Sequence, residues 1–237
     1  MVVKLKSIIG IVGRCGLSVF GKNNIEIFET YRNAVIKSGG IPIVILPPQT
    51  IEYYDIAPKD VNQLTEDEKD ILNEQLKLCD GVIIHGGVKQ FEYDKYICDY
   101  CNKNNVPLLG ICMGMQVMCN YNNDNKNIKI EDDSHYSLDD YKHYVKIDKN
   151  SKLFEILDTD KIMVNSFHHF KVNNSGSYKI VAYDNDVIEA VEKSDYDFNI
   201  GLQWHPEKNY DTDLNSQKIF NKFIETAKKY KEKKIIK

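Results

Sequence analysis

The stretch Val106-Pro107-Leu108-Leu109-Gly110-Ile111-Cys112-Met113-Gly114-Met115-Gln116 decides the fold of this chain. Its apolar first half predicts a buried β-strand, and the residues from about Gly114 onward predict a helix. Cys112 stands at the turn between them, with one glycine two positions before it and another two positions after it. This G-x-C-x-G pattern is the thiol form of the nucleophile elbow, a turn so sharp that side chains at the flanking positions would collide.

The elbow predicts a reactive sulfur. Cys112 would sit at the N-terminus of the following helix, where the backbone dipole favours a thiolate over a thiol. The backbone N–H of Met113 would then point at the space that an oxyanion occupies in acyl transfer. The plainer alternative is a small buried cysteine at a tight turn, and the strand and helix patterns around it favour the nucleophile.

Strand and helix patterns alternate on the N-terminal side of this stretch. Buried strands are predicted at residues 7–12, 41–46, 81–85 and 106–111. Helices are predicted between them at residues 24–38, 65–78 and 92–104, the second starting at a capping box. This alternation predicts an α/β fold with a doubly wound, mostly parallel sheet flanked by helices.

The C-terminal half is richer in strands. They are predicted at residues 144–147, 161–164, 178–183, 187–191 and 199–203, before a last amphipathic helix at 214–230. Residues 120–133 are rich in Asn and Asp and are interpreted as a surface loop. No linker interrupts the pattern, so we expect a single domain over residues 1–237.

Composition excludes several classes of protein. The chain has 237 residues, with 31 Lys and Arg against 35 Asp and Glu and a formal net charge of −4. This balance argues against nucleic-acid binding, which needs a basic surface. The apolar run at residues 8–12 is too short to cross a membrane, and residues 1–6 lack a signal-peptide pattern. We therefore expect a cytoplasmic protein with neither a membrane nor a nucleic-acid partner.

The six cysteines are interpreted as reduced thiols. Cys98 and Cys101 form a C-x-x-C pair, but no second pair completes a zinc site. His135 and His143 flank a loop and a strand, and no third ligand is evident beside them. We interpret both as structural or surface residues, and His85 as a histidine at the end of a strand. The sequence thus predicts no metal site.

A cysteine nucleophile needs a general base and a group that orients the base. His205 lies at the end of a predicted strand, and Glu207, two residues on, can hold its imidazole in one tautomer. Gly86-Gly87 ends another strand at the same edge of the sheet. The N–H of Gly87 is the natural second donor to an oxyanion, because backbone without a side chain can approach a substrate closely.

These segments, in this order, resemble the class I glutamine amidotransferase superfamily. The resemblance is closest to the γ-glutamyl-γ-aminobutyrate hydrolase and γ-glutamyl hydrolase family. It is carried by residues 8–14, 31–48, 80–87, 106–116, 164–169 and 201–207. It implies a flavodoxin-like fold with additional antiparallel strands in the C-terminal half, and chemistry that needs no cofactor.

The resemblance also assigns roles to residues. Cys112 would be the nucleophile, His205 the base and acid, and Glu207 the orienting carboxylate, while Gly87 and Met113 would form the oxyanion hole. The residues implied in substrate binding are Gly86, Gln116, His168, His169 and Phe170. Three departures from the family pattern touch the mouth of the pocket, and one is the loop from Asn120 onward, which lacks the family's usual Gly-Gly element. Val88-Lys89-Gln90-Phe91 follows the glycine pair where the family has Asp and then Pro, and Phe170 stands where Gln is common.

The resemblance implies that the chain cleaves the γ-glutamyl amide bond of a small molecule through a glutamyl thioester. Two alternatives stay open. The chain could be a glutaminase subunit that supplies ammonia to a separate synthetase partner, or a non-catalytic, redox-sensing relative. The sequence leaves open whether the chain forms a homodimer, and it does not identify the amine half of the substrate.

Overall fold

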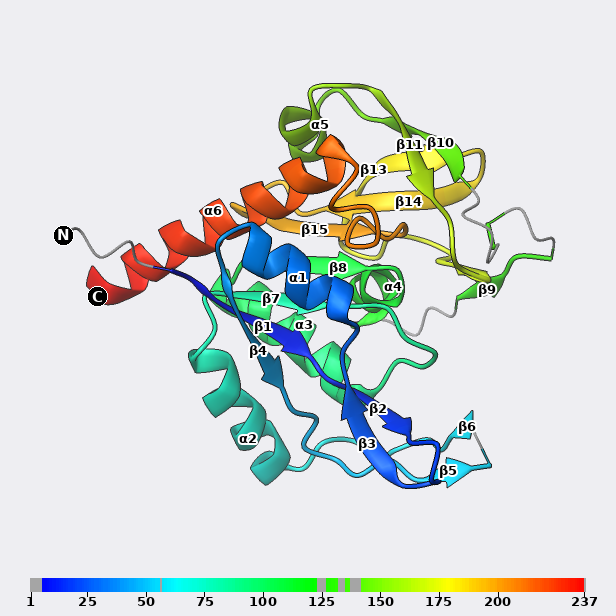
Figure 1. Ribbon diagram of the computed structural model, residues 1–237, viewed down its shortest axis with the longest axis vertical. Helices are drawn as coiled ribbons and strands as arrows, with labels where there is room; N and C mark the ends of the chain where they lie inside the picture. The colour runs from blue at the N-terminus through cyan, green and yellow to red at the C-terminus, as the bar shows by residue number, and fades with distance from the viewer. Residues whose placement is uncertain (1–5, 56, 123–126, 132–134, 137–141, 237) are drawn as a thin grey trace.

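The computed structural model describes residues 6–55, 57–122, 127–131, 135–136 and 142–236 (Figure 1). One nine-stranded sheet runs through this described part of the chain. In sheet order its strands are β11 (Lys161–Asn165), β10 (Lys142–Ile147), β13 (Lys179–Asp184), β14 (Val187–Glu192), β15 (Asn199–Leu202), β8 (Leu108–Ile111), β7 (Gly81–Ile84), β1 (Ile8–Val12) and β4 (Ile41–Ile45).

The sheet has a parallel half and an antiparallel half. Strands β4, β1, β7, β8 and β15 run parallel to one another. Strands β14, β13, β10 and β11 extend the sheet from β15 with antiparallel pairing throughout. Pro42 lies in the edge strand β4, where a missing N–H costs least. The predicted flavodoxin-like α/β fold with additional C-terminal antiparallel strands is confirmed.

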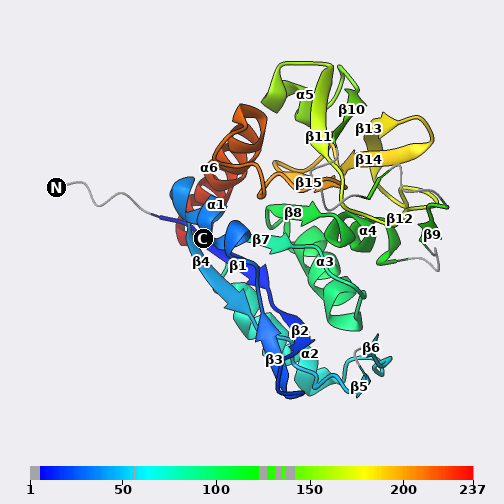
Figure 2. The same cartoon turned by 45° about the vertical axis from the view of Figure 1, so that its right-hand side comes forward.

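Helices cover both faces of the sheet (Figures 1 and 2). On one face lie α1 (Glu29–Lys37), α5 (Lys152–Leu157) and α6 (Leu214–Ile236), whose apolar side chains share a core with those of β1 and β15. On the other face, α2 (Glu66–Lys77), α3 (Glu92–Asn104) and α4 (Met113–Asn120) enclose a second core. Phe220 and Phe223 of α6 are completely buried, and burial of such a side chain stabilises the fold by about 1.5–3 kcal/mol.

Most of the predicted elements form. The capping box of α2 is present, with the Glu68 N–H donating to Thr65 Oγ1 and the Thr65 N–H donating to Glu68 Oε2. Besides a strand pair at residues 14–26, the elements that the sequence did not predict are α5 and the strand pairs β5 (Tyr53–Tyr54) with β6 (Ala57–Pro58) and β9 (Ile128–Lys129) with β12 (Phe170–Lys171). Within the predicted loop at 120–133, residues 123–126 and 132–133 lie outside the described residues.

The helix predicted at residues 24–38 is wrong in its first turn. Residues Asn23–Glu26 form β3, which pairs antiparallel with β2 (Arg14–Leu17), and α1 begins only at Glu29. Ile25 and Phe28, which contributed to the helical spacing, are both exposed. Pairing with β2 satisfies the backbone of this segment, and that tertiary contact outweighs the local pattern.

The parallel half brings several chain segments to one place. The segments that leave β1, β7, β8 and β15 all emerge at the carboxyl edge of the sheet, since these strands point the same way. Ligands of open α/β sheets bind outside this edge. Within the described residues, no helix is both long and apolar enough to cross a bilayer.

Candidate active site

Cys112 occupies the elbow between β8 and α4. Its backbone has φ 54° and ψ −110°, a conformation that costs a non-glycine residue about 1–3 kcal/mol. Its N–H donates to the carbonyl of Leu202 at 2.7 Å, which ties the turn to the neighbouring strand β15. The sheet therefore holds the thiol in one strained position at the N-terminus of α4.

The two glycines around Cys112 are required by close backbone approach. A Cβ on Gly114 would lie 1.7 Å from the carbonyl oxygen of Ile84 in β7. A Cβ on Gly110 would lie 2.3 Å from Met118 Sδ and 2.9 Å from the carbonyl carbon of Gly114. The predicted collision across the turn thus applies to Gly110, which approaches Gly114, whereas at Gly114 the obstacle is the backbone of the neighbouring strand β7.

His205 and Glu207 form a buried pair beside this turn. The Nδ1 of His205 lies 2.7 Å from Glu207 Oε1. Burial alone would lower the pKa of the imidazole, but the negative charges of Glu207 and Cys112 outweigh burial and raise that pKa from 6.5 to about 10. The Nε2 of His205 has no hydrogen-bond partner in the part of the chain that the structure describes, so it is available to exchange a proton.

Asn165, at the end of β11, fixes the backbone of His205. Its Nδ2 donates to the His205 carbonyl at 2.7 Å, and its Oδ1 accepts from the His205 N–H at 2.8 Å. Two buried hydrogen bonds from one amide leave the histidine backbone little freedom. The sequence analysis included Asn165 in a family-like segment but gave it no role, because the contact joins residues 40 positions apart.

Tyr31 of α1 is a second neighbour that the sequence analysis missed. Its hydroxyl lies 3.4 Å from His205 Nδ1 and accepts from the Gly86 N–H at 3.4 Å. Burial, followed by the negative charges of Glu207 and Cys112, raises the pKa of Tyr31 well above its ordinary value, so the phenol stays neutral. The helical spacing of α1 predicted a buried face but could not show that this face reaches the carboxyl edge of the sheet.

Gly86 and Gly87 lie against the same group of side chains. A Cβ on Gly86 would be 3.1 Å from His205 Cε1 and 3.6 Å from Cys112 Cβ. A Cβ on Gly87 would be 3.1 Å from Met113 Cε, so the two residues predicted to form an oxyanion hole are neighbours. The structure therefore brings together all five residues that were predicted for the reacting centre. Their roles remain predictions.

A buried ion pair is hydrogen-bonded to the backbone just before Gly86 and Gly87. Arg14 pairs with Asp94 of α3, and its Nη2 donates to the carbonyl of His85 at 2.5 Å. His85 itself is completely buried and stacks on Tyr31 with ring centroids 4.7 Å apart. Burial and the charge of Arg14 lower the pKa of His85 to about 3, so this histidine is neutral. These contacts agree with a structural, strand-end histidine.

The side chains of the predicted substrate-binding residues differ in their burial and in their hydrogen bonds. Gln116, in α4, is engaged at both ends of its amide: Nε2 donates to the Phe170 carbonyl at 3.1 Å and to Gln203 Oε1 at 3.2 Å, and Oε1 accepts from Asn127 Nδ2 at 2.7 Å. Gln116 thereby joins α4 to the segment that carries Phe170. Direct contact between this amide and a glutamyl group remains a prediction.

The remaining three lie between β11 and the start of β12. His168 is buried, and its Nδ1 lies 3.1 Å from the carbonyl oxygen of Phe170. His169 is exposed and stacks on Tyr136 with centroids 3.7 Å apart, and the Phe170 side chain is also exposed. Of these side chains, His168 alone faces inward.

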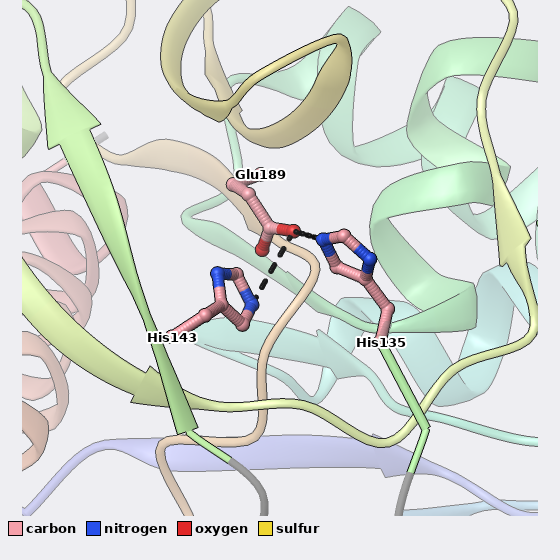
Figure 3. A group of neighbouring side chains, drawn as sticks. All are labelled: His135, His143 and Glu189. Carbon is pink, nitrogen blue, oxygen red and sulfur yellow. Dashed lines mark ion pairs between the residues drawn. The ribbon is translucent and has the colours of Figure 1, made fainter. Parts of the chain in front are cut away.

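His135 and His143, interpreted from the sequence as structural or surface residues without a third ligand, are both buried. They lie beside Glu189 of β14, a residue that the sequence analysis did not single out (Figure 3). Ligand atoms of the three side chains lie within 4.8 Å of one another. The one available signal was Glu189 itself, a charged residue inside the apolar run at residues 187–191.

Comparison with known proteins gives a family match and relatives of similar length. The model of the peptidase C26 family matches residues 88–207, just over half of the chain. A Schizosaccharomyces pombe protein, named as a putative glutamine amidotransferase, is 30% identical over 243 residues, which cover 90% of this chain and 85% of the relative. A Campylobacter jejuni γ-glutamyl-CDP-amidate hydrolase is 30% identical over 139 residues, covering 57% of this chain and 59% of the relative.

Among solved structures, the fold is similar to that of the glutaminase domain of Trypanosoma brucei CTPS with bound acivicin. The TM-score is 0.65 at 18% sequence identity, and the alignment covers 94% of each chain. At this identity the likeness concerns the fold.

Proposed function

The chain belongs to the peptidase C26 family, and from this we propose that it hydrolyses the γ-glutamyl amide bond of a small molecule through a thioester on Cys112. One observation carries the proposal: a strained, buried cysteine at a helix N-terminus lies beside a buried His205–Glu207 pair. The Campylobacter relative, named for hydrolysis of a γ-glutamyl compound, supports this class of substrate.

The first step forms the thioester. The Cys112 thiolate attacks the γ-carbonyl carbon, and the carbonyl oxygen takes up the negative charge. The N–H groups of Gly87 and Met113 stabilise this oxyanion, each by about 3–4 kcal/mol at comparable sites. When the C–N bond breaks, protonated His205 transfers a proton from Nε2 to the leaving amine, which departs as the neutral free amine.

The second step releases the acid. A water molecule gives a proton to the now neutral His205 and attacks the thioester carbon. The C–O bond forms, the C–S bond breaks, and the Cys112 thiolate leaves beside an imidazolium, as at the start. Glu207 stabilises that imidazolium through its bond to Nδ1. Raising the pKa of His205 to about 10 favours the charged pair that the first step requires.

The proposal is tested by the release of glutamate from γ-glutamyl amides, with glutamine among them. Cys112→Ala should lower kcat/KM by at least about 1,000-fold, because loss of a nucleophile removes the covalent route. Cys119→Ala, a second buried cysteine in the same helix, is the matched control and should retain activity within a few-fold. Equal turnover by wild type and Cys112→Ala would refute the proposal.

A second function has support from the fold neighbour. The Trypanosoma structure is named as a glutaminase domain, and the chemistry at Cys112 would be the same for glutamine. A glutaminase subunit would release ammonia from glutamine efficiently only with a synthetase partner present. Turnover of other γ-glutamyl amides by the isolated chain, in excess of glutamine turnover, favours the independent hydrolase.

A further inference from the structure

Three histidines surround the carboxylate of Glu189 on the antiparallel side of the sheet. Glu189 Oε1 lies 3.6 Å from His135 Nε2, 3.7 Å from His143 Nε2 and 3.8 Å from His168 Nε2. All four side chains are buried, and Glu189 has no exposed surface. In Figure 3 the rings of His135 and His143 both turn a nitrogen toward this carboxylate. Three chain segments thus direct a ring nitrogen toward one carboxylate oxygen.

The tautomer of His168 makes this arrangement informative. Its Nδ1 lies 3.1 Å from the Phe170 carbonyl, which can only accept, so Nδ1 carries the proton. In the neutral ring that metal ligation requires, Nε2 then carries the lone pair. That lone pair faces Glu189 Oε1. Neither atom has a hydrogen-bond partner within the described residues.

His143 has a second carboxylate, that of Asp184, close to its ring. Its Nδ1 lies 3.3 Å from Asp184 Oδ2, and its Nε2 is the nitrogen nearer to Glu189. Zinc-bound histidines usually bond a carboxylate or a backbone carbonyl through the second ring nitrogen, which fixes the ring and its tautomer. The Phe170 carbonyl supplies such a partner for His168, and the Asp184 carboxylate lies close enough to His143 Nδ1 to make the same kind of bond.

We propose that His135, His143, His168 and Glu189 form a transition-metal site, with Zn²⁺ the ion that this donor set suits best. A carboxylate oxygen and a histidine lone pair that face each other in a buried setting need either a proton or a cation between them. The negative charges of Glu189 and Asp184 balance a divalent ion in a setting where an unpaired charge would be costly.

The distances to Glu189 Oε1 are a little longer than tetrahedral zinc requires, and the ligand atoms of His135, His143 and Glu189 lie within 4.8 Å of one another. Zinc bound to nitrogen and oxygen at about 2.0–2.1 Å separates its ligand atoms by about 3.3 Å. The three distances to Glu189 Oε1, between 3.6 and 3.8 Å, require each histidine to approach by about 0.3–0.5 Å. Rotamer shifts of this size need no movement of the sheet.

The ion would have a structural role beside the catalytic pocket. It would join the segments before β10 and before β12, which carry His135 and His168, to β10 and β14 in the sheet. His168 lies two residues from Phe170, whose carbonyl holds Gln116 of the nucleophile helix. The site therefore anchors the segment in which substrate-binding residues were predicted. The inference does not depend on the proposed hydrolysis, because it concerns binding of a metal alone.

Metal binding is measured directly in the Cys112→Ala background, which removes a thiolate that could itself bind zinc. The purified protein is stripped with a chelator and titrated with Co²⁺ and then Zn²⁺. We expect one equivalent of Co²⁺ to bind with the visible absorption of a tetrahedral site and without thiolate charge-transfer bands. Zn²⁺ should displace it and raise Tm.

Three variants assign the site. Glu189→Gln, which keeps the shape of the side chain, should weaken binding by more than about 100-fold, and Asp184→Asn by about 10–100-fold. His169→Gln, at an exposed histidine next to His168, is the matched control and should bind as tightly as its parent. In chelator, Glu189→Gln should fold with an unchanged circular dichroism spectrum, which separates lost ligation from misfolding.

Two results would overturn the proposal. One is a Cys112→Ala protein that binds no Co²⁺ at micromolar concentration. The other is binding that Glu189→Gln leaves unchanged. The first result would mean that the cluster is held together without an ion, and the second that the ion binds elsewhere.

Discussion

Replacing Glu207 by Gln tests how the pKa of His205, the proposed catalytic histidine, is controlled. The substitution preserves the shape of the side chain and removes the charge that lies 2.7 Å from His205 Nδ1. Protonated His205 is the proposed acid for the leaving amine, so the alkaline limb of kcat/KM reports its pKa. In the wild type that limb should lie near pH 10, where the charges of Glu207 and Cys112 hold the pKa against the opposing effect of burial.

The size of the shift follows from the geometry. Opposite charges whose centres are about 4 Å apart attract by about 4 kcal/mol at an effective dielectric constant of about 20. Since one pKa unit equals about 1.4 kcal/mol, the carboxylate accounts for about three units. Burial and the thiolate remain in the variant, and their effects are already contained in the wild-type pKa of about 10. We therefore expect the alkaline limb of Glu207→Gln to fall to near pH 7.

Stability should follow the same titration. The pKa of His205 in the folded protein lies above its ordinary value of 6.5. The pair's contribution to the free energy of unfolding is therefore complete below about pH 6.5 and is lost as the pH rises through about 10. Urea unfolding of the wild type and Glu207→Gln should differ most at the lower pH.

Two measurements and one control variant test the expected change in the pKa of His205. Steady-state rates give the alkaline limb, and an NMR titration of the His205 ring gives its pKa even if the variant turns over too slowly to assay. Glu192→Gln removes another buried carboxylate, which accepts from the N–H groups of Lys152 and Leu153, and should leave the limb in place. An unchanged His205 pKa in Glu207→Gln would refute the electrostatic reasoning.

Two further substitutions probe the scaffold of the site. Gly114→Ala should destabilise the protein by at least about 3 kcal/mol in urea unfolding, because its Cβ would lie 1.7 Å from a backbone oxygen that cannot move alone. Gly21→Ala, where φ is +68° but the space is open, should cost only about 1 kcal/mol, and equal losses would contradict the collision argument. Asn165→Ala should cost about 1–3 kcal/mol and lower kcat more than it raises KM, since it frees the backbone of His205. A wild-type kcat in this variant would show that the clamp is dispensable.

The parallel half of the sheet was predictable because its signals are local. Each buried strand is a short apolar run closed by glycine or proline, and parallel strands in an α/β pattern must share a carboxyl edge. That rule alone predicted that Cys112, Gly87 and His205 would meet. The first turn of the helix predicted at residues 24–38 failed for the opposite reason, because strand pairing with residues 14–17 depends on the turn between them.

The histidine–carboxylate cluster could not be predicted because its members share no local pattern. His135, His143, His168 and Glu189 come from four separate segments, and antiparallel pairing around β14 determines which of them meet. Inspection of neighbouring residues alone therefore found no third ligand for His135 and His143.

The amino-acid sequence by itself determined the strand–turn–helix elbow at Cys112 and the family resemblance. It also placed Gly87 and His205 directly after strands that end at the same edge of the sheet. All of these depend on residues close together in the chain. Only the tertiary structure decided that Asn165 clamps His205, that Tyr31 reaches the pair and that three histidines surround Glu189. The physical reason is that these contacts join distant residues, and packing of the sheet and its helices selects them from many pairings that the sequence allows.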